Sequence, residues 1–140
     1  MKYSRLMGLD YGDVRIGVAL SDLSQSIASG YETYKCKSLD KDLEHFSNLI
    51  AEKEVSLIVI GLPLNMDGTE GARAEKTKQF GQKLSAKTNL PIVYVDERLT
   101  SVEAEEILID AGVRREKRKE LIDKVAATLI LESYLKSNKK

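Results

Sequence analysis

The first 34 residues carry three short apolar runs joined by brief connections, and this pattern constrains the fold more than any other. The runs cover residues 6–10, 16–21 and 27–34, with a Tyr-Gly-Asp turn after the first and a polar connection after the second. Strands joined by so few residues must be antiparallel, because a parallel pair needs a crossover of about a dozen residues or more. The N-terminal part therefore predicts three antiparallel strands.

The pattern changes after Asp40, where apolar residues recur at helical spacing, at Leu43, Phe46, Leu49 and Ile50. The run SLIVIGLP that follows is typical of a strand buried on both faces. A second helical stretch over residues 70–86 leads to another strand in PIVYVDER. These helical crossovers favour parallel strands, so we expect a mixed sheet in an α/β fold.

Two more helices are predicted after the last strand. In LTSVEAEEIL, Thr100 precedes Glu103 by three residues, which is the spacing of a capping box, and Gly112 marks the helix end. The final helix, from Glu116, carries a stripe that must pack on the sheet, formed by Ile122, Val125, Ala126, Leu129 and Ile130. A length of 140 residues fits one domain, so we expect residues 1–140 to form a single unit.

Charge and composition narrow the function classes. The 22 basic and 22 acidic residues balance, which argues against indiscriminate nucleic-acid binding. A local basic segment, RREKRKE at residues 114–120, can track a nucleic-acid backbone or be a solvated helix start. No secretion signal or membrane-length apolar stretch is evident, so we expect a cytoplasmic protein. Cys36 and His45 are the only residues of their types, which excludes an internal disulfide and a cysteine–histidine metal cluster.

Acidic residues stand at the ends of two predicted strands. Asp10 ends the first strand, and Asp96 and Glu97 end the last, where ligands of parallel α/β sheets collect. Side chains alternate along a strand, so only one of Asp96 and Glu97 is expected to face the site. Asp123 lies at the edge of the final helix stripe and can come over the same sheet edge. Three carboxylates without histidine or cysteine suit Mg²⁺ or Mn²⁺, and such sites suit phosphoryl-transfer chemistry.

Each acid also has a simpler interpretation. Asp10 can be a turn former, as aspartates at strand ends often are. Asp123 can be a solvated helix residue paired with Lys119, four positions earlier. Spacing alone therefore leaves the metal site open.

Four segments, taken in order, resemble the motifs of one known family: LDYGDVRIGVALSD, VIGLPLNMDGTEG, VDERLTSVEAEEIL and DKVAATLILESYL. The chain resembles the YqgF/RuvX family, which is similar to the RuvC resolvases, over nearly its whole length. Val14 departs from the family, which often has lysine there, whereas Arg15 is kept. The resemblance implies a ribonuclease H-like α/β fold, with a five-stranded mixed sheet of three antiparallel and then two parallel strands, flanked by helices.

The resemblance also implies the site residues. Asp10, Glu97 and Asp123 would be catalytic and hold the metal, Mg²⁺ or Mn²⁺, with Asp10 bridging two ions. Four side chains are expected to contact substrate phosphates: Arg15, Arg98, Asn65 and Arg73. Guanidinium groups match phosphate geometry, and the loop that carries the last two leads into a helix N-terminus. Pairing of Arg15 and Arg98 with the acids, and a purely turn-shaping role of the loop, remain open.

The implied function is that of a metal-dependent nuclease acting on structured nucleic acid, in 5′-end maturation of the small-subunit ribosomal RNA precursor. A Holliday junction resolvase acting on four-way DNA is the alternative, and a non-catalytic RNA or ribosome-assembly binding protein is a third. Actin-like ATPases and sugar kinases share the opening hairpin but need two domains. We expect a monomer or weak homodimer without membrane contact. The sequence does not distinguish RNA from branched DNA.

Overall fold

A five-stranded sheet with the order β3-β2-β1-β4-β5 forms the centre of the protein. The computed structural model describes residues 4–98 and 100–137. The strands are β1 (Arg5–Tyr11), β2 (Arg15–Ser21), β3 (Ala28–Lys35), β4 (Val55–Leu62) and β5 (Ile92–Asp96). The first three are antiparallel neighbours, whereas β4 and β5 run parallel to β1. The predicted mixed sheet of three antiparallel and two parallel strands is confirmed.

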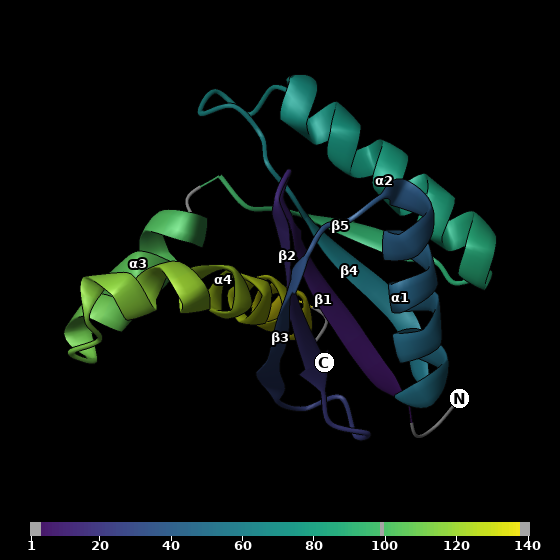
Figure 1. Cartoon of the computed structure of the whole chain (residues 1–140), viewed down its shortest axis with the longest axis horizontal. Helices are drawn as coiled ribbons and strands as arrows, with labels where there is room; N and C mark the ends of the chain where they lie inside the picture. The colour runs from purple at the N-terminus through teal and green to yellow at the C-terminus, as the bar shows by residue number, and fades with distance from the viewer. Residues whose placement is uncertain (1–3, 99, 138–140) are drawn as a thin grey trace.

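Two pairs of helices cover the sheet. They are α1 (Leu39–Glu52), α2 (Ala72–Thr88), α3 (Thr100–Asp110) and α4 (Arg115–Ser137). Figure 1 shows α1 and α2 against one face of the sheet, with α3 and α4 on the other. Local chemistry sets their ends: the Ser38 hydroxyl accepts a hydrogen bond from the Lys41 amide at the start of α1. Gly112, with φ of +76°, turns the chain between α3 and α4, as predicted.

The face under α1 and α2 is packed with large side chains. Residues that alternate along the strands point to this side, and aromatic rings of the helices meet them. The fully or nearly fully buried members include Met7, Leu9, Ile16, Val18, Phe46, Ile58, Ile60 and Phe80. This face therefore supplies most of the bulky apolar core.

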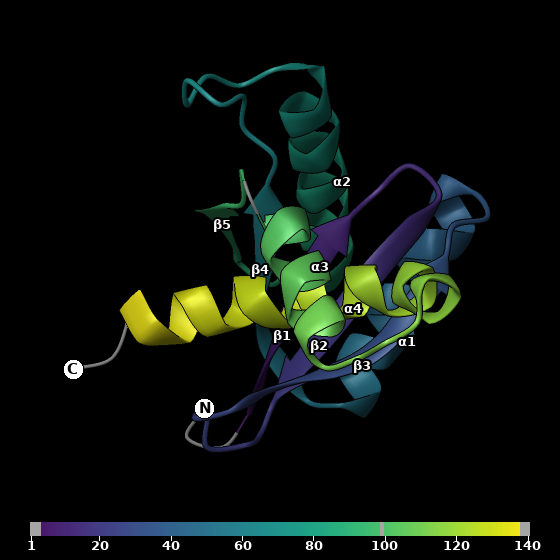
Figure 2. The ribbon, with the colours of Figure 1, turned by 90° about the vertical axis from the view of Figure 1, so that its left-hand side faces the viewer.

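The face under α4 is built differently, because glycines let the helix backbone lie directly on the strands. A Cβ atom placed on Gly8 would lie 2.9 Å from the Ala127 carbonyl oxygen. Figure 2 shows α4 crossing the strands of the sheet. The buried side of the helix is formed by Ala126, Ala127, Ile130 and Leu131.

The stripe predicted for the final helix is therefore partly wrong. Ala126 and Ile130 are buried as expected, but Ile122, Val125 and Leu129 are only half-buried. The helix rests on its small residues because close approach to the glycines stabilises that side, and the larger residues lie beside the contact.

Among the described helices, none combines the length and the apolar character that a membrane span requires.

Candidate functional site

Asp10 and Asp123 are brought together by the contact between α4 and β2. Asp10 lies on the same side of β1 as Gly8, two residues earlier, so it faces α4. Its direct partner in β2 is Gly17. A Cβ atom on Gly17 would overlap the carbonyl oxygen of Asp123, so α4 sits against the sheet beside Asp10. The prediction that the final helix carries Asp123 over the strand end is met by this packing.

Glu97 approaches Asp10 from the other side, across β4. The β1–β4 pairing ends at Leu9 and Ile60, which brings Gly61 level with Asp10. A Cβ atom on Gly61 would lie 2.8 Å from the Cγ atom of Glu97, so the glutamate side chain lies over the space that this glycine leaves. Glu97 is only 9% exposed.

The three acids, which we call the acid row, lie in surroundings that disfavour their charged forms. Burial, and then the charge of Asp123, raises the pKa of Asp10 to about 7. Burial, and then the charge of Asp10, raises the pKa of Glu97 to about 8. Burial also raises the pKa of Asp123, although the positive charge of Arg15 opposes this effect. Charging all three acids together is therefore unfavourable unless a cation balances them.

The donor chemistry of the acid row suits a hard divalent cation. All its donors are carboxylate oxygens, which are the ligands that Mg²⁺ and Mn²⁺ prefer. Among residues 4–98 and 100–137, no three ligating side chains are grouped closely enough to enclose an ion as they stand. The raised pKa values of Asp10 and Glu97 nevertheless mark a place where a cation would relieve repulsion. The residues fit the metal by their chemistry and their order across the sheet.

Two of the four predicted phosphate contacts lie next to the acid row. Arg73, in the first turn of α2, partly opposes the rise in the pKa values of Asp10 and Glu97 through its positive charge. Arg15 opens β2 and acts on Asp123 in the same way. Both side chains are exposed. Both arginines therefore act electrostatically on the acids and are accessible to a substrate.

The other two predicted phosphate contacts, Asn65 and Arg98, hold the loop between β4 and α2 in shape. The Asn65 side chain donates to the Thr69 hydroxyl at 3.0 Å, within a compact turn of the loop. Arg98 donates to both carboxylate oxygens of Asp96, with a closest distance of 2.7 Å, and to the Met66 carbonyl oxygen at 3.0 Å. The carboxylate that engages Arg98 is thus Asp96 and not an acid of the row. Phosphate contacts by Asn65 and Arg98 stay predictions.

Adjacent residues at the end of β5 have opposite environments, as their alternation predicts. Asp96 is exposed and paired with Arg98, whereas Glu97 is buried beside Asp10. Gly17 and Gly61 were not predicted as site residues, although both make room for the acid row. Glycine inside a strand is a signal of close approach by another chain segment, so their position was a usable clue.

Comparison with known proteins decides the family. A family model described as RuvX, Holliday junction resolvase, matches residues 4–137. The chain belongs to the RuvX family. A protein of Thermoanaerobacter pseudethanolicus named "Putative pre-16S rRNA nuclease" is 52% identical to it over 136 residues, covering 96% of this chain and 98% of the relative. A relative with the same name from Halothermothrix orenii is 52% identical over 131 residues and covers 94% of each chain.

Solved structures extend the similarity of this RuvX-family chain to its fold. RuvC of Thermus thermophilus in complex with a Holliday junction substrate matches with a TM-score of 0.60 at 10% identity, covering 97% of each chain. Fowlpox virus resolvase in complex with Holliday junction DNA matches with a TM-score of 0.61 at 12% identity, covering 97% of this chain and 99% of the other. The expected RuvC-like, ribonuclease H-like fold is confirmed.

Proposed function

We propose that this RuvX-family protein is a metal-dependent nuclease that matures the 5′ end of the small-subunit ribosomal RNA precursor. The names of relatives that are 52% identical over nearly the full length support this substrate. An activity on precursor ribosomal RNA also favours the cytoplasm as its location.

The arrangement of the acid row is the observation that carries the proposal. Asp123 on α4 and Glu97 after β5 flank Asp10 above the two strands next to β1, where Gly17 and Gly61 allow the close approach. Burial and mutual repulsion raise the pKa values of Asp10 and Glu97, and a purely structural role gives no reason for two carboxylates to be kept in that environment.

Asp10, Glu97 and Asp123 would hold Mg²⁺ or Mn²⁺. When bound, such ions activate a water molecule and stabilise the leaving oxygen of a phosphodiester. Arg15 and Arg73 are exposed cations beside the acids, so each can bind a phosphate oxygen and orient the substrate. The N-terminus of α2 adds backbone N–H groups, since its first residue follows Gly71, which provides no side-chain cap.

Cleavage of four-way DNA is the second candidate function. The fold similarity to two resolvases bound to Holliday junctions favours it, but at 10–12% identity this similarity supports the fold alone. A non-catalytic RNA or ribosome-assembly binding role is the third, and it differs because it does not need Asp10.

A cleavage assay separates the three. End-labelled precursor RNA fragments and four-way DNA junctions are offered separately, with Mg²⁺ or Mn²⁺, to the wild type, to Asp10→Asn and to Asp40→Asn. Asp40 is a matched control because it is an exposed aspartate in the first turn of α1. We expect the wild type and Asp40→Asn to cut the RNA, and Asp10→Asn to be slower by on the order of a thousandfold.

The other outcomes would redirect the proposal. Symmetric, Asp10-dependent cutting of the junction alone would establish a resolvase. Cutting by Asp10→Asn at the wild-type rate would refute the role of the acid row. Tight RNA binding with no cutting by the wild type would favour the non-catalytic role.

A further inference from the structure

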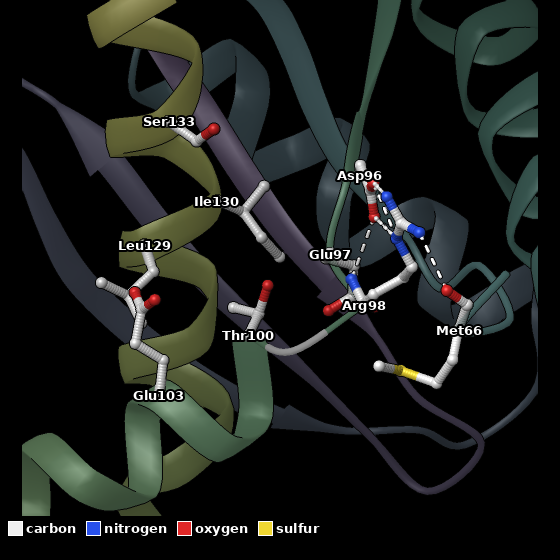
Figure 3. A pocket seen from close by; sticks show the side chains of 9 residues that line it. All are labelled: Met66, Asp96, Glu97, Arg98, Thr100, Glu103, Leu129, Ile130 and Ser133. Carbon is white, nitrogen blue, oxygen red and sulfur yellow. Dashed lines mark hydrogen bonds and ion pairs between the residues drawn. The ribbon is translucent and has the colours of Figure 1, made fainter. Parts of the chain in front are cut away.

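An open cavity of about 420 Å³ lies next to the acid row, at the β5 side of the site. Figure 3 shows its walls: the tip of the loop between β4 and α2, the end of β5, the first turns of α3, and one side of α4. Residues that line it include Met66, Glu97, Thr100, Glu103, Ile130 and Ser133. Its volume lies within the range of small-ligand sites, roughly 300–1,000 Å³, and suits one nucleoside.

The polar lining of the cavity is less suited to a phosphate than to an uncharged group. Glu103 brings a carboxylate group, which repels an anion, and Glu97 belongs to the acid row and offers no positive charge. Arg98 is the cation of the lining, but Asp96 and the Met66 carbonyl oxygen already engage it, as the dashed lines in Figure 3 show. A ligand that donates hydrogen bonds and carries no charge fits this set of groups.

The remaining lining matches the other parts of a nucleoside. Hydroxyl groups of Thr100 and Ser133 can bond to a sugar or to a base edge. Met66, which is 67% exposed, and Ile130 provide apolar surface for the face of a base. Methionine sulfur makes favourable contacts with aromatic rings, so Met66 suits a nucleobase in particular.

The other flank of the acid row, over β2 and β3, is lined by basic side chains. Arg15 lies beside Asp123 there, and the stem of Lys124 crosses Gly30 of β3. Lys119 is exposed one helical turn before Asp123. Phosphates therefore suit the β2 and β3 side, and the β5 side offers hydrogen-bond acceptors instead.

We propose that the cavity holds the nucleoside adjacent to the scissile phosphate, turned out of its stack. This inference rests on the proposed nuclease function, because Glu97 belongs to both the cavity and the acid row. A base in the cavity cannot remain paired, so the enzyme acts on a strand that is single or locally unpaired at the cut.

The test uses a precursor RNA fragment in which one abasic nucleotide is moved along the strand. Binding is measured by fluorescence anisotropy with Ca²⁺, and cutting is measured separately with Mg²⁺. For the wild type, we expect one abasic position, next to the cut, to weaken binding at least about tenfold, the size of effect that the loss of about one hydrogen bond already produces.

Ser133→Leu fills the cavity from an exposed position of α4, and Ser137→Leu makes the same change one helical turn further on, outside the lining. Ser133→Leu should bind intact RNA as weakly as the abasic RNA and no longer distinguish the two. Ser137→Leu should keep the wild-type distinction. Glu103→Gln replaces one acceptor oxygen by a donor without adding bulk, and it should reduce the abasic effect, whereas Glu106→Gln on the same helix should keep it.

Equal binding of intact and abasic RNA at every position would overturn the proposal, and so would an abasic effect of the same size in Ser133→Leu. These results do not depend on cutting. An RNA that the wild type cuts without any abasic effect contradicts the cavity assignment alone. An abasic effect that Ser133→Leu removes, in a protein that cuts nothing, upholds the cavity and contradicts the nuclease function.

Discussion

The two faces of the sheet are packed by different kinds of side chain. The face under α1 and α2 is packed by large aliphatic and aromatic side chains, such as Met7, Phe46 and Phe80. The face under α4 combines glycines and alanines with a few aliphatic side chains, such as Ile130 and Leu131, and the helix backbone touches the strands. All three acids of the row lie on this second face or at its edge.

The difference separates stability from positioning. Large buried side chains contribute most of the hydrophobic free energy. Small residues contribute less, but they let α4 come close enough to place Asp123 beside Asp10. Most of the hydrophobic core thus lies on one face of the sheet, and the buried carboxyl groups lie on the other.

The largest expected effect on stability is on the first face. Phe46 is fully buried, with ring centroids 5.3 Å from Tyr34 and 6.1 Å from Phe80. Phe46→Ala should lower the free energy of unfolding by about 3–5 kcal/mol, because it leaves a cavity. Urea denaturation measures this loss, and cleavage per folded molecule should stay at the wild-type value.

Leu39→Ala is the matched control, since Leu39 begins the same helix and is 41% exposed. It should change stability by about 0.5 kcal/mol or less. A loss of cleavage by folded Phe46→Ala would contradict the inference that one face supplies stability and the other positions the acids.

On the second face, Gly17→Ala should harm positioning more than folding. The added Cβ atom would overlap the Asp123 carbonyl oxygen, and α4 must shift to accommodate it. We expect a loss of about 1–3 kcal/mol in stability. Cleavage should fall about a hundredfold, the size of effect that a displacement of about 1 Å can produce.

Gly71→Ala provides the comparison, because the added atom there meets only the flexible side chain of Asn65 at 3.2 Å. Single-turnover kinetics and urea denaturation are measured on both variants. If Gly17→Ala were as active as Gly71→Ala, close approach of α4 would not be what positions Asp123.

A smaller effect is expected on the pH dependence of stability. The pKa values of Asp10 and Glu97 rise from 3.8 and 4.5 to about 7 and about 8 on folding. The folded state therefore binds more protons than the unfolded state between these limits, and stability falls as the pH rises from about 4 to about 8. In EDTA, the melting temperature of the wild type should be lower at pH 8 than at pH 5.

Asp10→Asn removes the buried carboxylate, so its melting temperature should fall less over this range, whereas Asp40→Asn should follow the wild type. Mg²⁺ should raise the melting temperature of the wild type more at pH 8 than at pH 5, since it competes with protons for the acid row. An unchanged pH dependence in Asp10→Asn would contradict the electrostatic difference between the faces.

The smallest effects concern Asp96 and Arg98, beside the buried Glu97. Lysine in place of Arg98 keeps the charge but loses the two-pronged contact with Asp96 and the bond to Met66. Exposed ion pairs of this kind contribute about 0–1 kcal/mol, so Arg98→Lys should change stability little and cleavage a few fold.

Asp96→Asn should have the same small effect on cleavage if Arg98 acts by holding the loop. Steady-state kinetics on both variants distinguishes this role from direct phosphate binding. A large loss in Arg98→Lys together with normal cleavage by Asp96→Asn would show that Arg98 contacts the substrate.

Much of the architecture follows from the sequence because it is encoded locally. Short connections dictate the antiparallel strands, and helical spacing after Asp40 dictates the first crossover. The alternation of β5 predicts that Asp96 and Glu97 differ in environment, which the structure confirms. The prediction of the α4 stripe failed at Ile122, Val125 and Leu129, because periodicity identifies an apolar side but not which part of it meets glycine.

The strands, the helices and the acids at the strand ends could be predicted from the sequence, since each depends on residues close together in the chain. Three features became visible only in the folded protein: Glu97 lies over Gly61, Arg98 engages Asp96, and a cavity opens between α3, α4 and β5. The physical reason is that these contacts join residues far apart in the chain. They depend on strand register and on how closely one helix approaches the sheet.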